Sequence, residues 1–125
     1  MTLKDTFLLK EAISSHIWVV SYHHTSPSET IILLNFTTPQ DGITDATCVI
    51  TRSECPMLNH DSAIAYQFGQ VFEGGNLAVL RRAGVRRYLT PVSEAVLLKI
   101  QQGAIASKFT PEKIKVLLRP IIGTS

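Results

Sequence analysis

The sequence predicts an α+β fold in which about five short antiparallel strands come first and two or three helices follow. Runs of β-branched and aromatic residues, separated by turn-forming residues, fill the chain up to residue 72. Beyond residue 73, helix-forming segments are framed by Thr-Pro pairs and glycines, which are typical of helix starts and ends. A block of strands followed by a block of helices is the order found in α+β proteins.

Length and composition favour one domain. The chain has 125 residues, 45% of them hydrophobic, which is enough to form a hydrophobic core that needs no disulfide bond for stability. We expect a strand part over residues 1–72 and a helical part over residues 73–125. No apolar run approaches the length of a membrane span, and the N-terminus lacks the pattern of a signal peptide. We therefore expect a cytoplasmic protein without a membrane contact.

Strands are expected at residues 5–9, 16–24, 29–38, 46–52 and 62–72, with Gly69 as a candidate bulge in the last. The segments 16–24 and 29–38 are almost continuously apolar. Such a strand is covered on both faces, as in a small barrel or at the centre of a sheet.

Helices are expected at about residues 76–83, 91–102 and 111–119. Gly84 and Gly103 are expected to end the first and second helices. Thr90 and Thr110, each followed by proline, are the expected N-caps of the second and third helices, and Pro120 follows the third.

Charge is distributed unevenly along the chain. Residues 1–72 carry seven acidic and three basic residues, whereas residues 73–125 carry three acidic and nine basic ones. Four of the bases, Arg81, Arg82, Arg86 and Arg87, lie within seven residues. This cluster is able to attract a polyanion such as RNA or DNA, and the alternative is an ordinary solvated face.

The segment 47–66 holds both cysteines and several polar side chains. Cys48, Cys55 and His60 are too loosely spaced for a structural zinc site, which normally has paired ligands on two knuckles. We therefore expect no metal and no cofactor, and two cysteines that remain thiols. Cys55 close to His60 is a candidate nucleophile, but an ordinary loop cysteine is the favoured interpretation.

Acid–base cleavage of RNA is a third interpretation of these polar residues. It needs a base near the 2′-hydroxyl, an acid for the leaving group and a cation for the phosphate. The candidates are His60 or His16 for proton transfer, a hydroxyl of Thr37, Thr38 or Ser62, and an arginine from residues 81–87.

Several segments resemble the PemK/MazF-like proteins, and more closely a group of small uncharacterised bacterial proteins similar to them. The matching residues are His16–Val20, Asn35–Thr38, Thr47–Val49, Pro56, His60, Ser62 and Tyr66. The resemblance covers about residues 5–72 and, more loosely, the helix near residues 93–107. It implies an SH3-like β-barrel, frequent dimerisation and, in toxin members, a metal-independent endoribonuclease inhibited by an antitoxin.

This chain departs from the toxins at one strand. They carry an arginine or an acidic residue on the strand that residues 62–72 match, whereas this segment has no charged residue. The hydroxyl pair of the closer group is kept as Thr37 and Thr38, and Cys55 replaces its loop histidine. The expected catalytic residues are therefore His60, Ser62 and Thr38. The expected nucleic-acid contacts are Arg81, Arg82, Arg86, Arg87, Thr37, His16 and Tyr66.

Two functions from different classes stay open. One is a toxin-type endoribonuclease of a toxin–antitoxin pair, and the other is a non-enzymatic barrel module that binds a protein or a nucleic acid. The expected partners are RNA or DNA, and an antitoxin or another protein. We also expect a homodimer, because Ile114, Val116, Leu117 and Leu118 give the last helix more apolar surface than one face hides.

Overall fold

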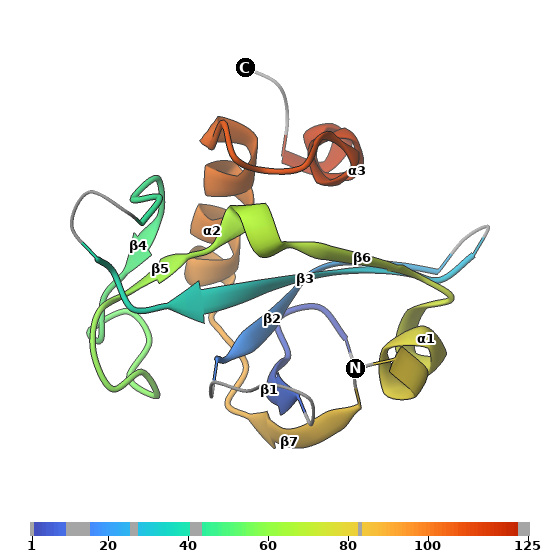
Figure 1. The fold of residues 1–125 in the computed structure, drawn as a ribbon, viewed down its shortest axis with the longest axis horizontal. Coiled ribbons are helices and arrows are strands. Elements are labelled where there is room, and N and C mark those ends of the chain that lie inside the picture. The colour runs from blue at the N-terminus through green and yellow to red at the C-terminus, as the bar shows by residue number, and fades with distance from the viewer. Residues whose placement is uncertain (1, 10–15, 26–27, 41–43, 83, 123–125) are drawn as a thin grey trace.

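The computed structural model describes residues 2–9, 16–25, 28–40, 44–82 and 84–122, and these form a mainly antiparallel open sheet with three helices. Figure 1 shows α2 and α3 on one side of the central strand β3 and α1 on the other. The α+β prediction is therefore confirmed. Within the described residues, no helix has the length and apolar character needed to cross a membrane.

The sheet contains seven strands in the order β4-β5-β3-β2-β1-β7, and β6 pairs with β3 beside this path. Their bounds are β1 Thr6–Leu9, β2 Trp18–His24, β3 Thr30–Thr37, β4 Val49–Ile50, β5 Ser62–Ile64, β6 Gln70–Glu73 and β7 Val85–Leu89. The first half of β3 pairs with β6 and its last residues pair with β5, while β2 pairs along its other edge. β3 is therefore the centre of the sheet.

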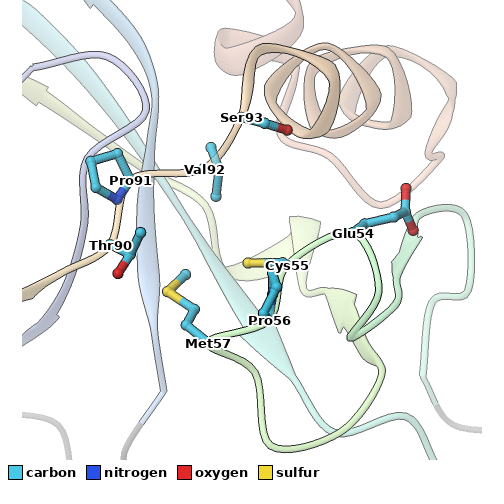
Figure 2. Close-up of a pocket in the computed structure, with 8 residues that line it drawn as sticks. All are labelled: Glu54, Cys55, Pro56, Met57, Thr90, Pro91, Val92 and Ser93. Carbon is cyan, nitrogen blue, oxygen red and sulfur yellow. The ribbon is translucent and has the colours of Figure 1, made fainter.

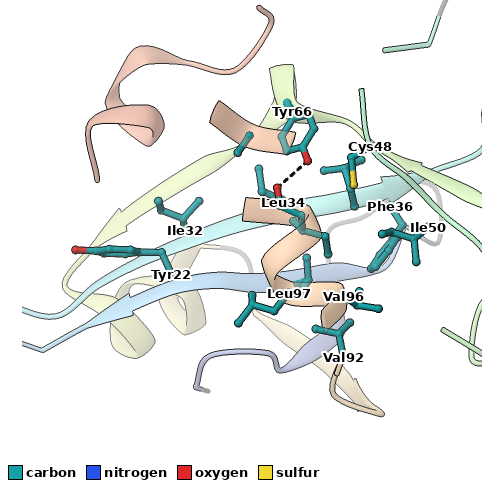
Figure 3. Packing of buried hydrophobic residues seen from close by; sticks show 14 of the residues in the cluster. Tyr22, Ile32, Leu34, Phe36, Cys48, Ile50, Tyr66, Val92, Val96 and Leu97 are labelled. Atoms are coloured by element: carbon teal, nitrogen blue, oxygen red, sulfur yellow. Dashed lines mark hydrogen bonds between the residues drawn. The ribbon is translucent and has the colours of Figure 1, made fainter. Parts of the chain in front are cut away.

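The hydrophobic core has two parts, one on each face of β3. Ile31 and Leu33 belong to a cluster that includes Val79 of α1. Ile32 and Leu34 point the other way, into a larger cluster formed with α2 and α3 (Figure 3). Successive side chains of a strand point to opposite faces, so a strand covered on both sides must be continuously apolar. The apolar run at residues 29–38 predicted this correctly.

The predicted strand at residues 62–72 is divided in three. β5 is followed by a single 3₁₀ turn, η1 Tyr66–Phe68, and β6 begins after Gly69. A Cβ atom at Gly69 would lie 2.5 Å from Ile114 Cδ1 and 2.9 Å from Leu34 Cδ2. Gly69 therefore permits close packing of α3 on the sheet, and the bulge expected there is instead a break between two strands. Of the predicted strand 46–52, only Val49–Ile50 pairs as a strand.

Strand β7 was not predicted. Residues 85–89 pair antiparallel with β1, from Leu89 opposite Thr6 to Val85 opposite Leu9. The two arginines within β7 are exposed, so the strand has no continuous apolar pattern. Its conformation comes from the open edge of β1, which is distant in sequence.

The helices are α1 Gly75–Arg82, α2 Glu94–Ala106 and α3 Glu112–Ile122. The N-cap of α2 is Ser93, whose hydroxyl accepts a hydrogen bond from Val96 N at 3.2 Å. The prediction that Thr90 caps this helix is therefore wrong. Residues 90–92 run beside the first strand instead, because Thr90 O accepts from the Thr6 hydroxyl and Val92 N donates to Lys4 O. These bonds hold the chain extended until Ser93.

Three further helix signals were misinterpreted. Gly103 lies inside α2, which continues to Ala106, and not at its end. The Thr110 hydroxyl is buried without a hydrogen-bond partner among the described residues, so it does not cap α3. Pro120 lies within the last turn of α3, where a proline removes one helical hydrogen bond without ending the helix.

The apolar surface of α3 is smaller than expected. Ile114 and Leu118 are fully buried in the core, so they do not contribute to an exposed face. Val116 and Ile121 are each 56% exposed, and Leu117 is half-buried. Of the four apolar residues on which the homodimer prediction rested, only Val116 and, in part, Leu117 are therefore accessible to a partner.

Candidate functional site

The antiparallel register of β3 and β5 brings two predicted catalytic segments together. Thr37 pairs with Ala63, which places the end of β3 beside the loop that precedes β5. There the Thr38 hydroxyl lies 3.2 Å from Nε2 of His60. The Ser62 hydroxyl donates to the His60 carbonyl at 3.1 Å and lies 3.5 Å from His60 Nδ1. The three predicted catalytic residues are thus neighbours in space.

The backbone fixes the tautomer of His60. Its Nδ1 lies 3.0 Å from the Asp61 carbonyl oxygen, which accepts hydrogen bonds and cannot donate them. In the neutral ring Nδ1 therefore carries the proton, and Nε2 has the lone pair. The Thr38 hydroxyl must then be the donor to Nε2. A hydroxyl bonded to a base that is itself oriented by a third group is an arrangement typical of proton-transfer sites.

His16 and Thr37 line the same small pocket as His60 and Ser62. The pocket has a volume of about 90 Å³, and its other lining residues are Ile17, Phe36, Leu58 and Asn59. Nδ1 of His16 lies 3.1 Å from the Phe36 carbonyl oxygen, so His16 has the same neutral tautomer as His60. Five of the sequence-predicted site residues, His16, Thr37, Thr38, His60 and Ser62, therefore gather at one place.

Tyr66 does not belong to this group. It is fully buried, and its hydroxyl donates to the Ile100 carbonyl of α2 at 2.7 Å (Figure 3). Burial, followed by the proximity of Cys48, raises the pKa of Tyr66 far above its usual range. Tyr66 is a core residue that joins η1 to α2, and a role in nucleic-acid binding is not compatible with this position.

The four clustered arginines are exposed, but they do not line the His16–His60 pocket. Arg81 and Arg82 end α1, and Arg86 and Arg87 lie on β7. The chain turns between the pairs at Gly84, whose φ is +66°. In Figure 1, α1 and the β4–β5 region lie at opposite ends of the long axis. None of the four lines the His16–His60 pocket.

Arg52 is a basic residue that the sequence analysis did not select. It belongs to the loop between β4 and β5 that carries His60, and its Nε–H donates to the Leu58 carbonyl at 3.1 Å. Leu58 is one of the residues lining the His16–His60 pocket. Arg52 is the only lysine or arginine in the sequence between residues 11 and 80, a signal that would have identified it.

Cys55 lines a larger and separate cavity of about 410 Å³ between residues 54–57 and 90–93. Figure 2 shows Cys55 and Met57 facing the segment Thr90–Ser93 across this space. Burial raises the pKa of the Cys55 thiol, so the thiol is protonated at neutral pH and a poor nucleophile. His60 meanwhile bonds Thr38 and Asp61. The arrangement does not support a Cys55–His60 pair.

Cys48 is a buried core residue, and both cysteines are free thiols. Burial raises the pKa of Cys48 as well, and its Sγ lies 3.7 Å from the Lys99 carbonyl oxygen. Across the described parts of the chain, no three His, Cys, Asp or Glu side chains lie close enough to share a metal ion.

Comparison of the chain with protein-family models finds no match, and comparisons with curated proteins and with solved structures find none either. The arrangement of the side chains is therefore the basis for any functional assignment.

Proposed function

We propose that this chain is a PemK/MazF-like, metal-independent endoribonuclease whose catalytic residues are His60, Thr38 and Ser62, with His16 as the general acid. The observation that carries the proposal is the hydrogen bond of the Thr38 hydroxyl to the lone-pair nitrogen of His60. The proposal includes an SH3-like barrel. The way in which β3 pairs with β5 at one end and β6 at the other supports such a strongly coiled sheet.

His60 is the general base in this scheme. The 2′-hydroxyl of an RNA strand replaces the Thr38 hydroxyl at Nε2 and gives its proton to His60. The resulting 2′-oxygen attacks the adjacent phosphorus, and the bond from phosphorus to the 5′-oxygen breaks. His16, in its imidazolium form, protonates that leaving oxygen. The products are a 2′,3′-cyclic phosphate and a free 5′-hydroxyl, and proton exchange with water restores both histidines.

The phosphate is held by hydroxyls and one cation. Thr37 and Thr38 present hydroxyl groups beside the histidines, and each is able to donate to a non-bridging oxygen. The Ser62 hydroxyl, which donates to the His60 carbonyl in the free protein, does so only after it exchanges that bond for one to the phosphate. Arg52 supplies positive charge from the same loop as His60. Arg81 and its neighbours, the cations expected from the sequence, bind more distant phosphates of the strand in this proposal.

Replacing His60 with alanine should lower the rate of RNA cleavage about 100-fold, because positioned acid–base groups contribute factors of that order. The assay follows a fluorogenic RNA in the presence of EDTA, with the cyclic phosphate product identified by mass spectrometry. His24→Ala is the matched control, since His24 lies on the exposed end of β2. An unchanged rate in His60→Ala would remove the catalytic role.

A second candidate function is a non-enzymatic module that binds nucleic acid through its basic surface. The exposed arginines on α1 and β7 favour it. In a variant with Arg81, Arg82, Arg86 and Arg87 replaced by glutamine, the salt dependence of RNA binding should decrease. For single-stranded RNA, each lost phosphate contact reduces the magnitude of the negative slope of log K against log salt by about 0.7. Equal slopes for variant and wild type would show that the arginines form only a solvated face.

A toxin-type role also implies protein partners. We propose an antitoxin and a second copy of the chain as these partners. Val116 and Ile121 of α3 are the exposed apolar residues through which the second copy would pack on this helix. Light scattering over a range of concentrations tests the dimer.

A further inference from the structure

A second hollow adjoins the histidine pocket at Thr37, which lines both. Its volume is about 180 Å³, and its lining residues are Thr37, Thr38, Gln40, Thr44, Asp45, Ala65, Gln67 and Phe68. Because Thr38 also bonds His60, a group bound in the hollow lies next to the proposed catalytic base. None of the hollow's other residues takes part in the proposed chemistry.

Phe68 gives the hollow an exposed aromatic ring. The turn η1 directs Tyr66 into the core and leaves Phe68 60% exposed, with Phe68 N donating to the Ala65 carbonyl at 3.1 Å. An exposed phenyl ring beside polar groups is a surface on which a planar ring stacks, and every nucleobase has such a face.

The polar groups of the hollow suit the edge of a base better than a phosphate. Gln40 and Gln67 are exposed amides, which donate and accept hydrogen bonds. Burial raises the pKa of Asp45, but hydrogen bonds from Ser107 and Thr47 outweigh burial and hold it below its usual value. Asp45 is therefore a fixed negative charge. It repels a phosphate and accepts from exocyclic amino groups, as aspartate does from cytosine.

The volume of the hollow also favours a nucleobase as the ligand. Sites for drug-sized ligands have volumes of about 300–1,000 Å³. At about 180 Å³ the hollow is smaller than that and twice the volume of the histidine pocket. One planar heterocycle fits these dimensions, whereas the histidine pocket suits a phosphate group.

We propose that this hollow is a nucleobase subsite, which seats one unpaired base of an RNA strand on Phe68 while the neighbouring phosphate lies at His60. The inference depends on the proposed function for the position of the phosphate. A base within a duplex has its faces stacked and its edge paired, so this subsite accepts only an unpaired base. Asp45 makes the subsite favour bases with an amino group, namely adenine, cytosine and guanine, over uracil.

The test measures binding without cleavage. Six-nucleotide RNAs with 2′-O-methyl groups, which lack the attacking hydroxyl, are titrated into wild type and variants, with fluorescence anisotropy as the readout. Phe68→Ala should weaken binding about 10-fold or more, as expected for loss of one stacked base, and Phe68→Trp should retain it. Phe109→Ala, another exposed phenylalanine that does not line the hollow, should remain within about twofold of wild type.

Base preference gives a second readout. The uracil-only RNA should bind more weakly to wild type than the cytosine-only RNA, and Asp45→Asn should reduce that difference. Equal binding by Phe68→Ala and wild type would overturn the subsite, as would the absence of any binding by wild type. If Phe68→Ala weakens binding but wild type cleaves no RNA, the subsite stands and the proposed endoribonuclease fails. If cleavage depends on His60, and Phe68→Ala matches wild type in both cleavage and RNA affinity, the proposed endoribonuclease stands and the subsite fails.

Discussion

Replacing Gly103 with alanine should destabilise the protein by about 3 kcal/mol, although the same change in an open helix stabilises it by about 1 kcal/mol. Gly103 lies in α2 at the point where Tyr66 and Cys48 pack against the helix. A Cβ atom there would lie 2.2 Å from the Tyr66 hydroxyl oxygen and 2.8 Å from Cys48 Cβ. Both distances are far below van der Waals contact, so the neighbours must move.

Movement of Tyr66 has a second cost. Its hydroxyl donates to the Ile100 carbonyl at 2.7 Å in a fully buried position. A displaced hydroxyl left without a partner costs about 1–3 kcal/mol. Urea unfolding of wild type and Gly103→Ala gives the change in the free energy of unfolding.

The control is the same substitution in a Tyr66→Phe background, where the clashing oxygen is absent. The effect of Gly103→Ala should then become smaller, which a double-mutant cycle measures. If Gly103→Ala proves as stable as wild type, α2 and η1 do not pack as closely as the structure shows.

The features of the fold that sequence predicted well are those that local pattern determines. The apolar run at residues 29–38 indicates a strand with two covered faces whatever its neighbours are, and β3 Thr30–Thr37 is that strand. By contrast, β7 and the start of α2 depend on hydrogen bonds to the first strand and the residues just before it. Gly103 looks like a helix end locally, but its small size serves contact with Tyr66. Such contacts between distant segments leave no local pattern.

The candidate site shows the same division. Residue type and the family resemblance together selected His60, Ser62 and Thr38, and the structure brings them together through the pairing of β3 with β5. The direction of their hydrogen bonds, which leaves the lone pair of the neutral His60 ring at Nε2, depends on the Asp61 carbonyl and was beyond prediction. Phe68 was missed because the predicted strand ran through it, whereas the turn η1 turns its ring outward.

Truncation of Leu118 to alanine should destabilise the protein by about 3–4 kcal/mol, the range typical of a buried leucine. Leu118 is fully buried among residues of the larger core cluster, although it belongs to the last helix. Its removal leaves a cavity between α3 and the sheet, because the rigid strands beneath it collapse only in part.

Val116 provides the matched control on the same helix, because it is apolar but 56% exposed. In a monomer, Val116→Ala should change the free energy of unfolding by less than about 0.5 kcal/mol, as surface substitutions usually do. If a second copy of the chain covers α3, Val116→Ala should instead destabilise the protein, and the effect should grow with protein concentration. A small effect of Leu118→Ala would show that α3 is not docked on the core. Urea unfolding of both variants at two concentrations therefore separates the buried face of α3 from a face that contacts a partner.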